Sequence, residues 1–203
     1  MKQKPIFITG IGTGVGKTVT SAVWVEKLKA DYWKPVQSGD LDHTDTDQVR
    51  SLVSNNISIF HPEAYRLTQP FSPHKSAALD GVSINIDQIL LPETDRQLII
   101  EGAGGLMVPL NDKDLMIDLI KKLDAEVVLV SQNYLGSINH TLMSVEILKS
   151  RNIKISKFVI CGACDKSSEE IISKHLDKDI FHIPVFNNLD KRDIHKFTSQ
   201  LIL

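Results

Sequence analysis

A glycine-rich turn followed by a lysine and a threonine lies near the start of the chain. Glycines let the backbone turn tightly so that successive N–H groups face phosphate oxygens, and a helix N-terminus adds its positive end. Lys17 would reach the β- and γ-phosphates, and the Thr18 hydroxyl would coordinate Mg²⁺. We therefore expect a nucleoside triphosphate site formed by the residues Thr13, Gly14, Val15, Gly16, Lys17, Thr18 and Val19.

The spacing of this loop differs slightly from the usual phosphate-binding pattern. Ile11 occupies the place of the first glycine, and Gly10 stands one residue earlier. A glycine-rich turn without a ligand is one alternative. A dinucleotide-binding turn is another, but it would leave Lys17 and Thr18 without a role. We interpret the segment as a longer variant of the triphosphate loop.

Two charged residues stand at the ends of later apolar runs. Lys34 lies within the run 32–36, and Glu101 precedes the small residues 102–105. In open α/β sheets ligands bind beyond the carboxyl ends of the strands, and a lysine there must meet an anion or reach water. We expect Lys34 to act on the phosphates and Glu101 to belong to the metal site; the alternatives are a surface lysine and a structural cap.

A second carboxylate for Mg²⁺ is expected in the acidic stretch 40–47, because Mg²⁺ commonly takes one or two carboxylates besides phosphate and water. The stretch offers Asp40, Asp42, Asp45 and Asp47. By charge alone it is also an ordinary solvated loop. Residue chemistry does not choose among the four.

The only two cysteines form a Cys-x-x-Cys, Cys161 and Cys164. They could be a redox pair, half of a metal site, or two small apolar residues after a strand. A closed zinc site needs about four ligands, and the sequence shows no second cluster nearby. We interpret the pair as small apolar residues.

Composition excludes several classes of protein. The 203 residues are 42% hydrophobic and 24% charged with a formal net charge of -2, as in an ordinary folded protein. The charge supplies no excess of basic residues for nucleic acid or an anionic membrane surface. No apolar stretch reaches the roughly 20 residues of a membrane helix, and residues 1–5 do not begin a secretory signal. We expect a single domain over 1–203, cytoplasmic, with neither nucleic acid nor membrane as partner.

The elements that would position these residues alternate between short β-branched runs and helical patterns, which is typical of βαβ units around a mostly parallel sheet. Helices are expected from the loop through Trp24 and Leu28, around 115–123, and over 137–151. The segment 52–92, interrupted by four prolines, is expected to be an irregular excursion with short helices. The strands are expected at 6–9, 32–36, 98–101, 127–131, 158–161 and 180–183.

Together the motifs resemble the dethiobiotin synthetases, a P-loop family related to the Min and Par ATPases and the nitrogenase iron protein. The matching blocks occur in family order over about two-thirds of the chain. They are Gly10-x5-Gly16-Lys17-Thr18, Lys34-Pro35-Val36-x-Ser38-Gly39, Pro70-x-Ser72-Pro73-His74, Glu101-Gly102-Ala103-Gly104-Gly105 and Leu135-Gly136-x-Ile138-Asn139-His140.

The resemblance implies an α/β P-loop NTPase-like fold with about seven mostly parallel strands and helices on both faces, in a homodimer. It also implies an ATP-dependent cyclo-ligase of biotin biosynthesis that uses Mg²⁺. One amine of 7,8-diaminononanoate would take up CO₂ as a carbamate, and ATP would phosphorylate the carbamate. The second amine would then close the ureido ring and expel phosphate.

Site roles follow from the resemblance by position. Lys17 and Lys34 would be catalytic, with Lys34 holding carbamate and γ-phosphate together. Ser38 would contact the carbamate. Thr18, Asp47 and Glu101 would hold Mg²⁺, with Asp45 as the alternative carboxylate.

The remaining implied positions bind the diamine and the nucleotide. The backbone of Gly102, Ala103, Gly104 and Gly105 would face the diamine and the phosphates. Leu135, Gly136 and Asn139 of the other subunit would receive its carboxylate at a helix start, so that the substrate site lies at the dimer interface. The adenine pocket would contain Cys161, Gly162, Pro184 and Val185.

Three positions depart from the family pattern. Gly14 replaces an acidic residue that is frequent in the loop, and Tyr134 replaces a lysine that can precede Leu135. Cys161 and Gly162 stand where an Asn-Asp pair can read adenine. A thiol is a weak hydrogen-bonding group and glycine has no side chain, so we predict relaxed selectivity for the base.

Two rival functions share the expected fold. A regulatory ATPase of the Par or Min type would carry a signature lysine where this chain has Gly12. Another amide-forming ligase of the superfamily would typically need a glutaminase domain with a nucleophilic cysteine, for which the chain has no room. The sequence favours the cyclo-ligase over both.

Overall fold

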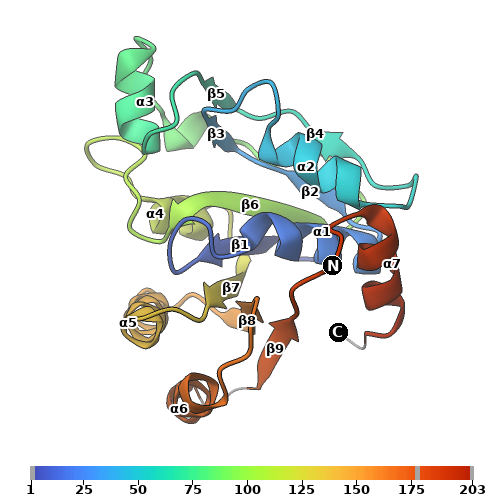
Figure 1. The fold of residues 1–203 in the computed structure, drawn as a ribbon. Coiled ribbons are helices and arrows are strands. Elements are labelled where there is room, and N and C mark those ends of the chain that lie inside the picture. The colour runs from blue at the N-terminus through green and yellow to red at the C-terminus, as the bar shows by residue number, and fades with distance from the viewer. Residues whose placement is uncertain (1–2, 177–178, 202–203) are drawn as a thin grey trace.

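A seven-stranded parallel sheet forms the centre of the computed structural model, which describes residues 3–176 and 179–201 (Figure 1). The strand order is β4-β2-β6-β1-β7-β8-β9, and each neighbouring pair is parallel. The strands are β1 (Ile6–Gly10), β2 (Asp31–Trp33), β4 (Phe60–His61), β6 (Leu98–Gly105), β7 (Glu126–Gln132), β8 (Ile155–Cys161) and β9 (Ile180–Ile183). The prediction of a P-loop-type α/β sheet is confirmed.

Helices cover both faces of the sheet, and each face has its own apolar core. One core joins the sheet to α1 (Lys17–Leu28), α2 (Asp45–Leu52) and α7 (Lys191–Ser199). The other joins it to α3 (Pro73–Leu79), α4 (Met116–Lys122), α5 (Ser137–Ser150) and α6 (Lys166–Leu176), together with the short 3₁₀ helix η1 (Ile86–Gln88). Because the central strands are buried on both faces, they are nearly continuous Val, Ile and Leu runs rather than alternating ones.

The apolar residues that recur along helix α5 pack against the core. The sequence predicts one apolar face on this helix, and Val145 and Leu148 of that face are 2% and 0% exposed. Ile138 and Leu142 are partly buried against the same core. The helix ends at Ser150, one residue before the predicted end.

The expected strand 32–36 is confirmed only at Tyr32 and Trp33, because the strand is interrupted at Lys34 and Pro35. β2 ends at Trp33, and β3 (Val36–Ser38) pairs instead with β5 (Tyr65–Leu67) in a separate two-stranded sheet. Proline has no N–H and cannot continue a central ladder. The Pro35 carbonyl accepts hydrogen bonds from the backbone of Ala64 and Tyr65, which starts the new pairing.

The excursion 52–92 is more regular than the proline pattern predicts. It contains the short helices α3 and η1, but also β5 and the edge strand β4. The edge strand pairs with β2 through Tyr32 and Trp33. A two-residue strand has too short an apolar run to be distinguished from a loop in the sequence.

Candidate active site

The glycine-rich loop wraps from β1 into the start of α1, as its sequence predicts. Gly16 has a φ of +94°, and a Cβ there would lie 2.7 Å from that of Cys161, so only glycine fits. Gly16 is the N-cap and offers no side-chain acceptor, so the first turn of α1 can bind an anion with its N–H groups.

Lys17 lies across this loop and is almost buried. Its Nζ donates to the carbonyl oxygen of Gly12 at 3.0 Å. Burial, and then the positive charge of Lys34, lower the pKa of Lys17 to about 8. A bound phosphate would therefore stabilise the charged form of Lys17.

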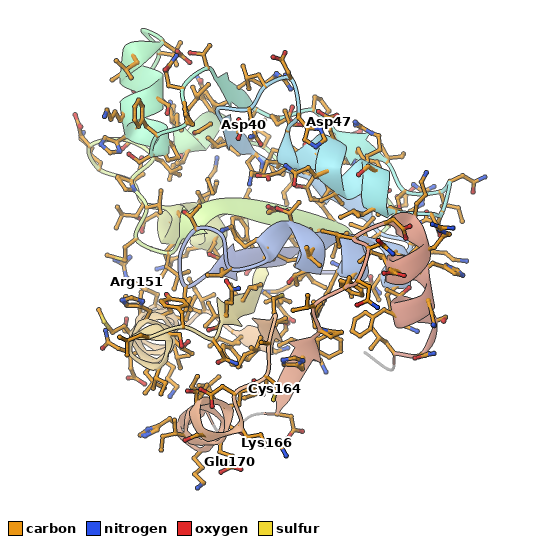
Figure 2. The ribbon with its side chains drawn as sticks, in the orientation of Figure 1. Asp40, Asp47, Arg151, Cys164, Lys166 and Glu170 are labelled. Atoms are coloured by element: carbon orange, nitrogen blue, oxygen red, sulfur yellow. The ribbon has the colours of Figure 1, made fainter. Side chains whose placement is uncertain are left out.

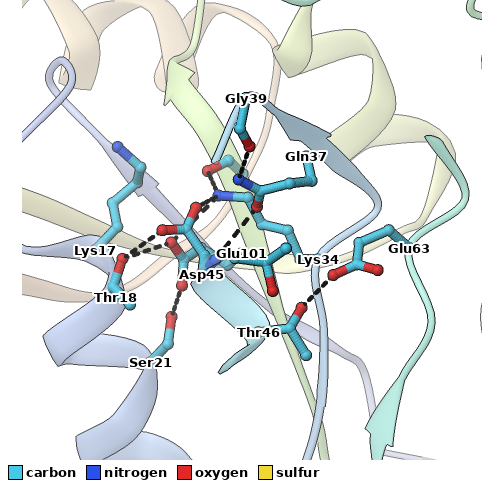
Figure 3. A network of polar contacts seen from close by, with 12 residues as sticks. Lys17, Thr18, Ser21, Lys34, Gln37, Gly39, Asp45, Thr46, Glu63 and Glu101 are labelled. Carbon is cyan, nitrogen blue, oxygen red and sulfur yellow. Dashed lines mark hydrogen bonds and ion pairs between the residues drawn. The ribbon is translucent and has the colours of Figure 1, made fainter. Parts of the chain in front are cut away.

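Three oxygen-bearing side chains meet beside the loop, around Glu101 in the middle of β6 (Figure 3). Thr18 Oγ1 lies 3.1 Å from Glu101 Oε1 and 3.3 Å from Asp45 Oδ1. Thr18 comes from the first turn of α1, Glu101 from β6, and Asp45 from the start of α2. A hydroxyl and two carboxylates are the donor set that Mg²⁺ prefers in nucleotide sites, so these residues fit that ion.

Lys34 points into the same cluster and is 3% exposed. Its Nζ lies 2.5 Å from Asp45 Oδ2 and 3.3 Å from Glu101 Oε1, and it donates to the Gly102 carbonyl at 3.3 Å. Burial lowers the pKa of Lys34, but the carboxylates of Glu101 and Asp45 outweigh burial and raise that pKa above its ordinary value. Lys34 is therefore a buried ammonium paired with two carboxylates rather than a surface lysine.

Two residues that the sequence analysis missed fix the position of Glu101. Ser21 Oγ and Tyr32 Oη donate to Glu101 Oε2 at 2.7 and 3.1 Å. Burial, followed by the Glu101 charge, raises the pKa of Tyr32 well above its ordinary value, so the phenol remains a donor. The one available signal was the spacing of Ser21, three residues after Thr18 on the same helix.

The structure brings Asp45 to the cluster and gives Asp47 another role. Asp47 Oδ2 accepts from the backbone N and the hydroxyl of Thr44, while Asp47 Oδ1 accepts from Arg50 at 2.8 Å. Thr44 and Asp47 form a capping box at the start of α2. The cap turns the Asp47 side chain outward to 43% exposure, so the structure brings Asp45, the alternative carboxylate, and not Asp47 into contact with Thr18.

A cavity of about 420 Å³ opens next to Lys34 and Asp45. The Ser38 hydroxyl lies at this cavity, buried and without a hydrogen-bond partner in the described structure. Gly39 (φ +72°) packs so closely on Pro70 that a Cβ would lie 2.7 Å from it, which joins two of the sequence motifs into one wall. Ala103 and Gly104 also line the cavity.

The predicted base-binding residues lie at the ends of β8 and β9. Cys161 is 7% exposed and turns its sulfur behind the loop, 3.3 Å from Thr20 Oγ1, and burial raises the pKa of its thiol to about 11. Gly162 follows with a φ of +103°, while Pro184 and Val185 are exposed. These residues offer backbone groups, not side-chain donors, to a nucleotide base.

The start of α5 lies away from the cavity. Leu135 is 103% exposed, and Gly136 and Asn139 are also exposed. Of the residues described, neither these three nor Gly105 lines the cavity beside Ser38. Tyr134, at the position where a lysine is frequent, is tied by its hydroxyl to His140 Nδ1 at 2.8 Å.

Comparison with known sequences agrees with this geometry. A family model described as an AAA domain matches residues 4–193. The chain is 54% identical over 171 residues to the ATP-dependent dethiobiotin synthetase BioD of Christiangramia forsetii, covering 84% of this chain and 82% of that protein. It is 48% identical over 201 residues to the protein of the same name from Cytophaga hutchinsonii, covering 98% and 97%.

Comparison with solved structures shows the fold. A ParA family ATPase from Chlorobium tepidum superposes with a TM-score of 0.57 at 14% identity, covering 98% of this chain and 100% of that one. The MinD protein from Pyrococcus horikoshii, solved with Mg-ADP, gives 0.58 at 12% identity, covering 97% and 95%. At these identities the likeness extends to the P-loop sheet and not to the activity.

Proposed function

The chain belongs to the dethiobiotin synthetase family, and we propose that the cluster around Lys34 is where its ATP-dependent ring closure takes place. The observation that carries this proposal is the buried Lys34 ammonium, which contacts both Asp45 and Glu101 beside the phosphate loop. It borders a cavity with an unpartnered Ser38 hydroxyl.

The two lysines would neutralise the charge that is transferred. A carbamate formed from 7,8-diaminononanoate and CO₂ is an anion, and the γ-phosphoryl group is another. Lys34 would hold the two together, while Lys17 would follow the phosphoryl group from ADP to the carbamate oxygen. Phosphoryl transfer depends mainly on positioning and charge stabilisation, which these two cations supply.

Thr18, Asp45 and Glu101 would hold Mg²⁺. The chemistry that the ion would supply there is neutralisation of the charge on the phosphates of ATP. Ser21 and Tyr32 keep Glu101 pointing at this position, because both donate to its other oxygen.

The diamine would lie in the cavity lined by Ser38, Ala103 and Gly104. Buried polar groups are nearly always hydrogen-bonded, so the free Ser38 hydroxyl points to a ligand group. The carbamate is the group that this hydroxyl would contact. The second amine would then attack the carbamoyl carbon and expel phosphate.

The substrate carboxylate would be received by a second copy of the chain. Leu135, Gly136 and Asn139 do not line the cavity of their own subunit, and Leu135 has no cover. Met107 and Met143 nearby are 50% and 55% exposed and border a second cavity of about 370 Å³. An exposed apolar group of this kind supports a dimer interface.

The site's compartment and domain organisation are part of the proposal as well. None of the described helices is long and apolar enough to cross a membrane. We keep the cytoplasm as the compartment and 1–203 as one catalytic domain; of these, 1–2, 177–178 and 202–203 lie outside the described residues.

A product assay tests the function. The protein is incubated with the diamine, bicarbonate and Mg-ATP, and dethiobiotin, ADP and phosphate are measured. We expect equal amounts of the three products, and negligible ATP hydrolysis without diamine. ATP hydrolysis that does not depend on the diamine would contradict the proposal and favour a switch ATPase.

A mixing experiment tests the shared site. Asn139→Asp sets a negative charge against the substrate carboxylate and should raise the KM for diamine. Mixing this variant with Lys34→Gln should restore activity, because a mixed dimer keeps one site free of both changes. A strict monomer, or the absence of restoration between two folded variants, would contradict the interface proposal.

A further inference from the structure

Three side chains of different chemistry converge beside the start of α6, outside the site described above. Cys164, labelled in Figure 2, lies in the connection from β8 to α6. Glu169 lies in the first turn of α6, and His182 lies on β9. One ligand atom from each, a sulfur, an oxygen and a nitrogen, all lie within 4.8 Å of one another. Cys164 is exposed and the other two are half-buried, so the group can be reached from solvent.

Two polar atoms at this group lack the partners that buried atoms require. His182 Nε2 and Asn133 Oδ1 are buried and have no hydrogen-bond partner in the described structure. His182 Nε2 lies 3.8 Å from Glu169 Oε1, beyond hydrogen-bond distance. Buried polar atoms without a partner are uncommon, so each of the two calls for one.

Glu169 is already held in the orientation of a ligand. Its Oε1 accepts from Asn133 Nδ2 at 2.8 Å and from the backbone N of Asp165 at 3.0 Å. Its Oε2 faces Cys164 Sγ at 3.6 Å. Ligating carboxylates are typically fixed in this way by hydrogen bonds to their outer oxygen.

We propose that Cys164, Glu169 and His182 form a binding site for Zn²⁺. Bond lengths of about 2.0–2.3 Å in a tetrahedral site place ligand atoms roughly 3.3–3.8 Å apart. The Glu169 carboxylate lies 3.6 Å from Cys164 Sγ through Oε2 and 3.8 Å from His182 Nε2 through Oε1, and the three ligand atoms lie within 4.8 Å of one another, so small side-chain shifts would close the site. A sulfur and an imidazole favour zinc over Mg²⁺, which prefers oxygen ligands. Three protein ligands leave the fourth position to water. Binding releases the thiol proton to solvent, since the metal binds the thiolate.

The site would tie together the two segments that end at the predicted base pocket. Cys164 follows Gly162 by two residues, and His182 precedes Pro184 by two. A metal between them would join the β8–α6 connection to β9. This inference rests on side chains that the proposed ring closure does not use, so either can fail without the other.

Zinc titration of the reduced, full-length protein tests the proposal. A chromophoric chelator competes for the metal in the presence of millimolar Mg²⁺. We expect one equivalent bound by the wild type, and a loss of at least about tenfold in affinity in each of Cys164→Ser, Glu169→Gln and His182→Ala. Glu170→Gln and His175→Ala, which change exposed neighbours on α6, are the matched controls and should bind like the wild type.

Cobalt identifies the ligands directly. Co²⁺ at this site should show a thiolate charge-transfer band that Cys164→Ser abolishes. Circular dichroism of each variant without metal checks that it is folded. The proposal is overturned by a wild type that binds no zinc, by unchanged affinity in the three variants, or by binding that Asp45→Asn abolishes instead.

Discussion

The phosphate end and the base end of the proposed nucleotide site are built in opposite ways. At the phosphate end, Lys34, Asp45 and Glu101 are charged, mostly buried, and each contacts at least two partners. At the base end, Cys161 turns away behind the loop, and Val185 is 71% exposed. Fixed charges are concentrated where phosphoryl transfer would occur, and backbone groups are left to meet the base.

This difference indicates which end of the site would determine the rate of the reaction and which end would discriminate little between nucleotides. Preorganised charges stabilise a transition state strongly because they do not reorganise during the reaction. An exposed backbone surface contributes contact but little discrimination between bases. Changes at the phosphate end should therefore affect turnover, and changes of nucleotide base should have small effects.

The largest effect is expected at Lys34. Lys34→Gln removes the cation that would bridge carbamate and γ-phosphate and should lower kcat by about 10²- to 10³-fold. Steady-state rates, nucleotide affinity and thermal melting would be measured together. Lys4→Gln, which changes an exposed lysine paired with Asp124, is the control. A folded Lys34→Gln protein with near-normal kcat would break the contrast between the two ends.

The next effect separates two neighbouring carboxylates. Asp45→Asn should raise the Mg²⁺ concentration for half-maximal rate by about ten- to hundredfold, as for the loss of a group that orients a metal. Asp47→Asn should change it little, because Asp47 caps α2. An effect at Asp47 alone would assign the metal to Asp47, and equal effects of the two substitutions would contradict the assignment to Asp45 alone.

The third effect is a pH dependence of ATP affinity that arises from Lys17. Because the pKa of free Lys17 is lowered to about 8, the side chain is protonated below that pH and loses its charge above it. A triphosphate favours the charged form, so affinity should fall as pH rises above about 8, by up to about tenfold per pH unit. Lys17→Arg keeps its charge and should give a flat profile. Calorimetric titration at pH 7 to 9 measures the affinity. An affinity of the wild type that does not change with pH would show that the pKa of Lys17 is not lowered.

The smallest effect is expected at the base end. With no side-chain donor from Cys161 or Gly162, GTP or CTP should support turnover within about tenfold of ATP, equivalent to ~1.4 kcal/mol. kcat/KM for the four nucleotides at saturating diamine and Mg²⁺ measures the difference. An ATP preference of a hundredfold or more would mean that backbone groups read the base and that the two ends are equally selective.

The sequence by itself determined the parts that depend on local spacing. The phosphate loop, the Val- and Ile-rich central strands and the apolar face of α5 follow from residues that are neighbours along the chain. Lys34 and Glu101 could be identified because each stands where an apolar run ends, and parallel strands end at the same edge of a sheet.

Only the tertiary structure decided between residues that local chemistry treats alike. Asp45 and Asp47 are both acidic, and what separates them is the direction in which the first turn of α2 points each side chain. Ser21, Tyr32 and the Cys164, Glu169 and His182 group depend on elements distant in sequence that pack together. Their pairing arises from the order of strands in the sheet, which no short window of sequence encodes.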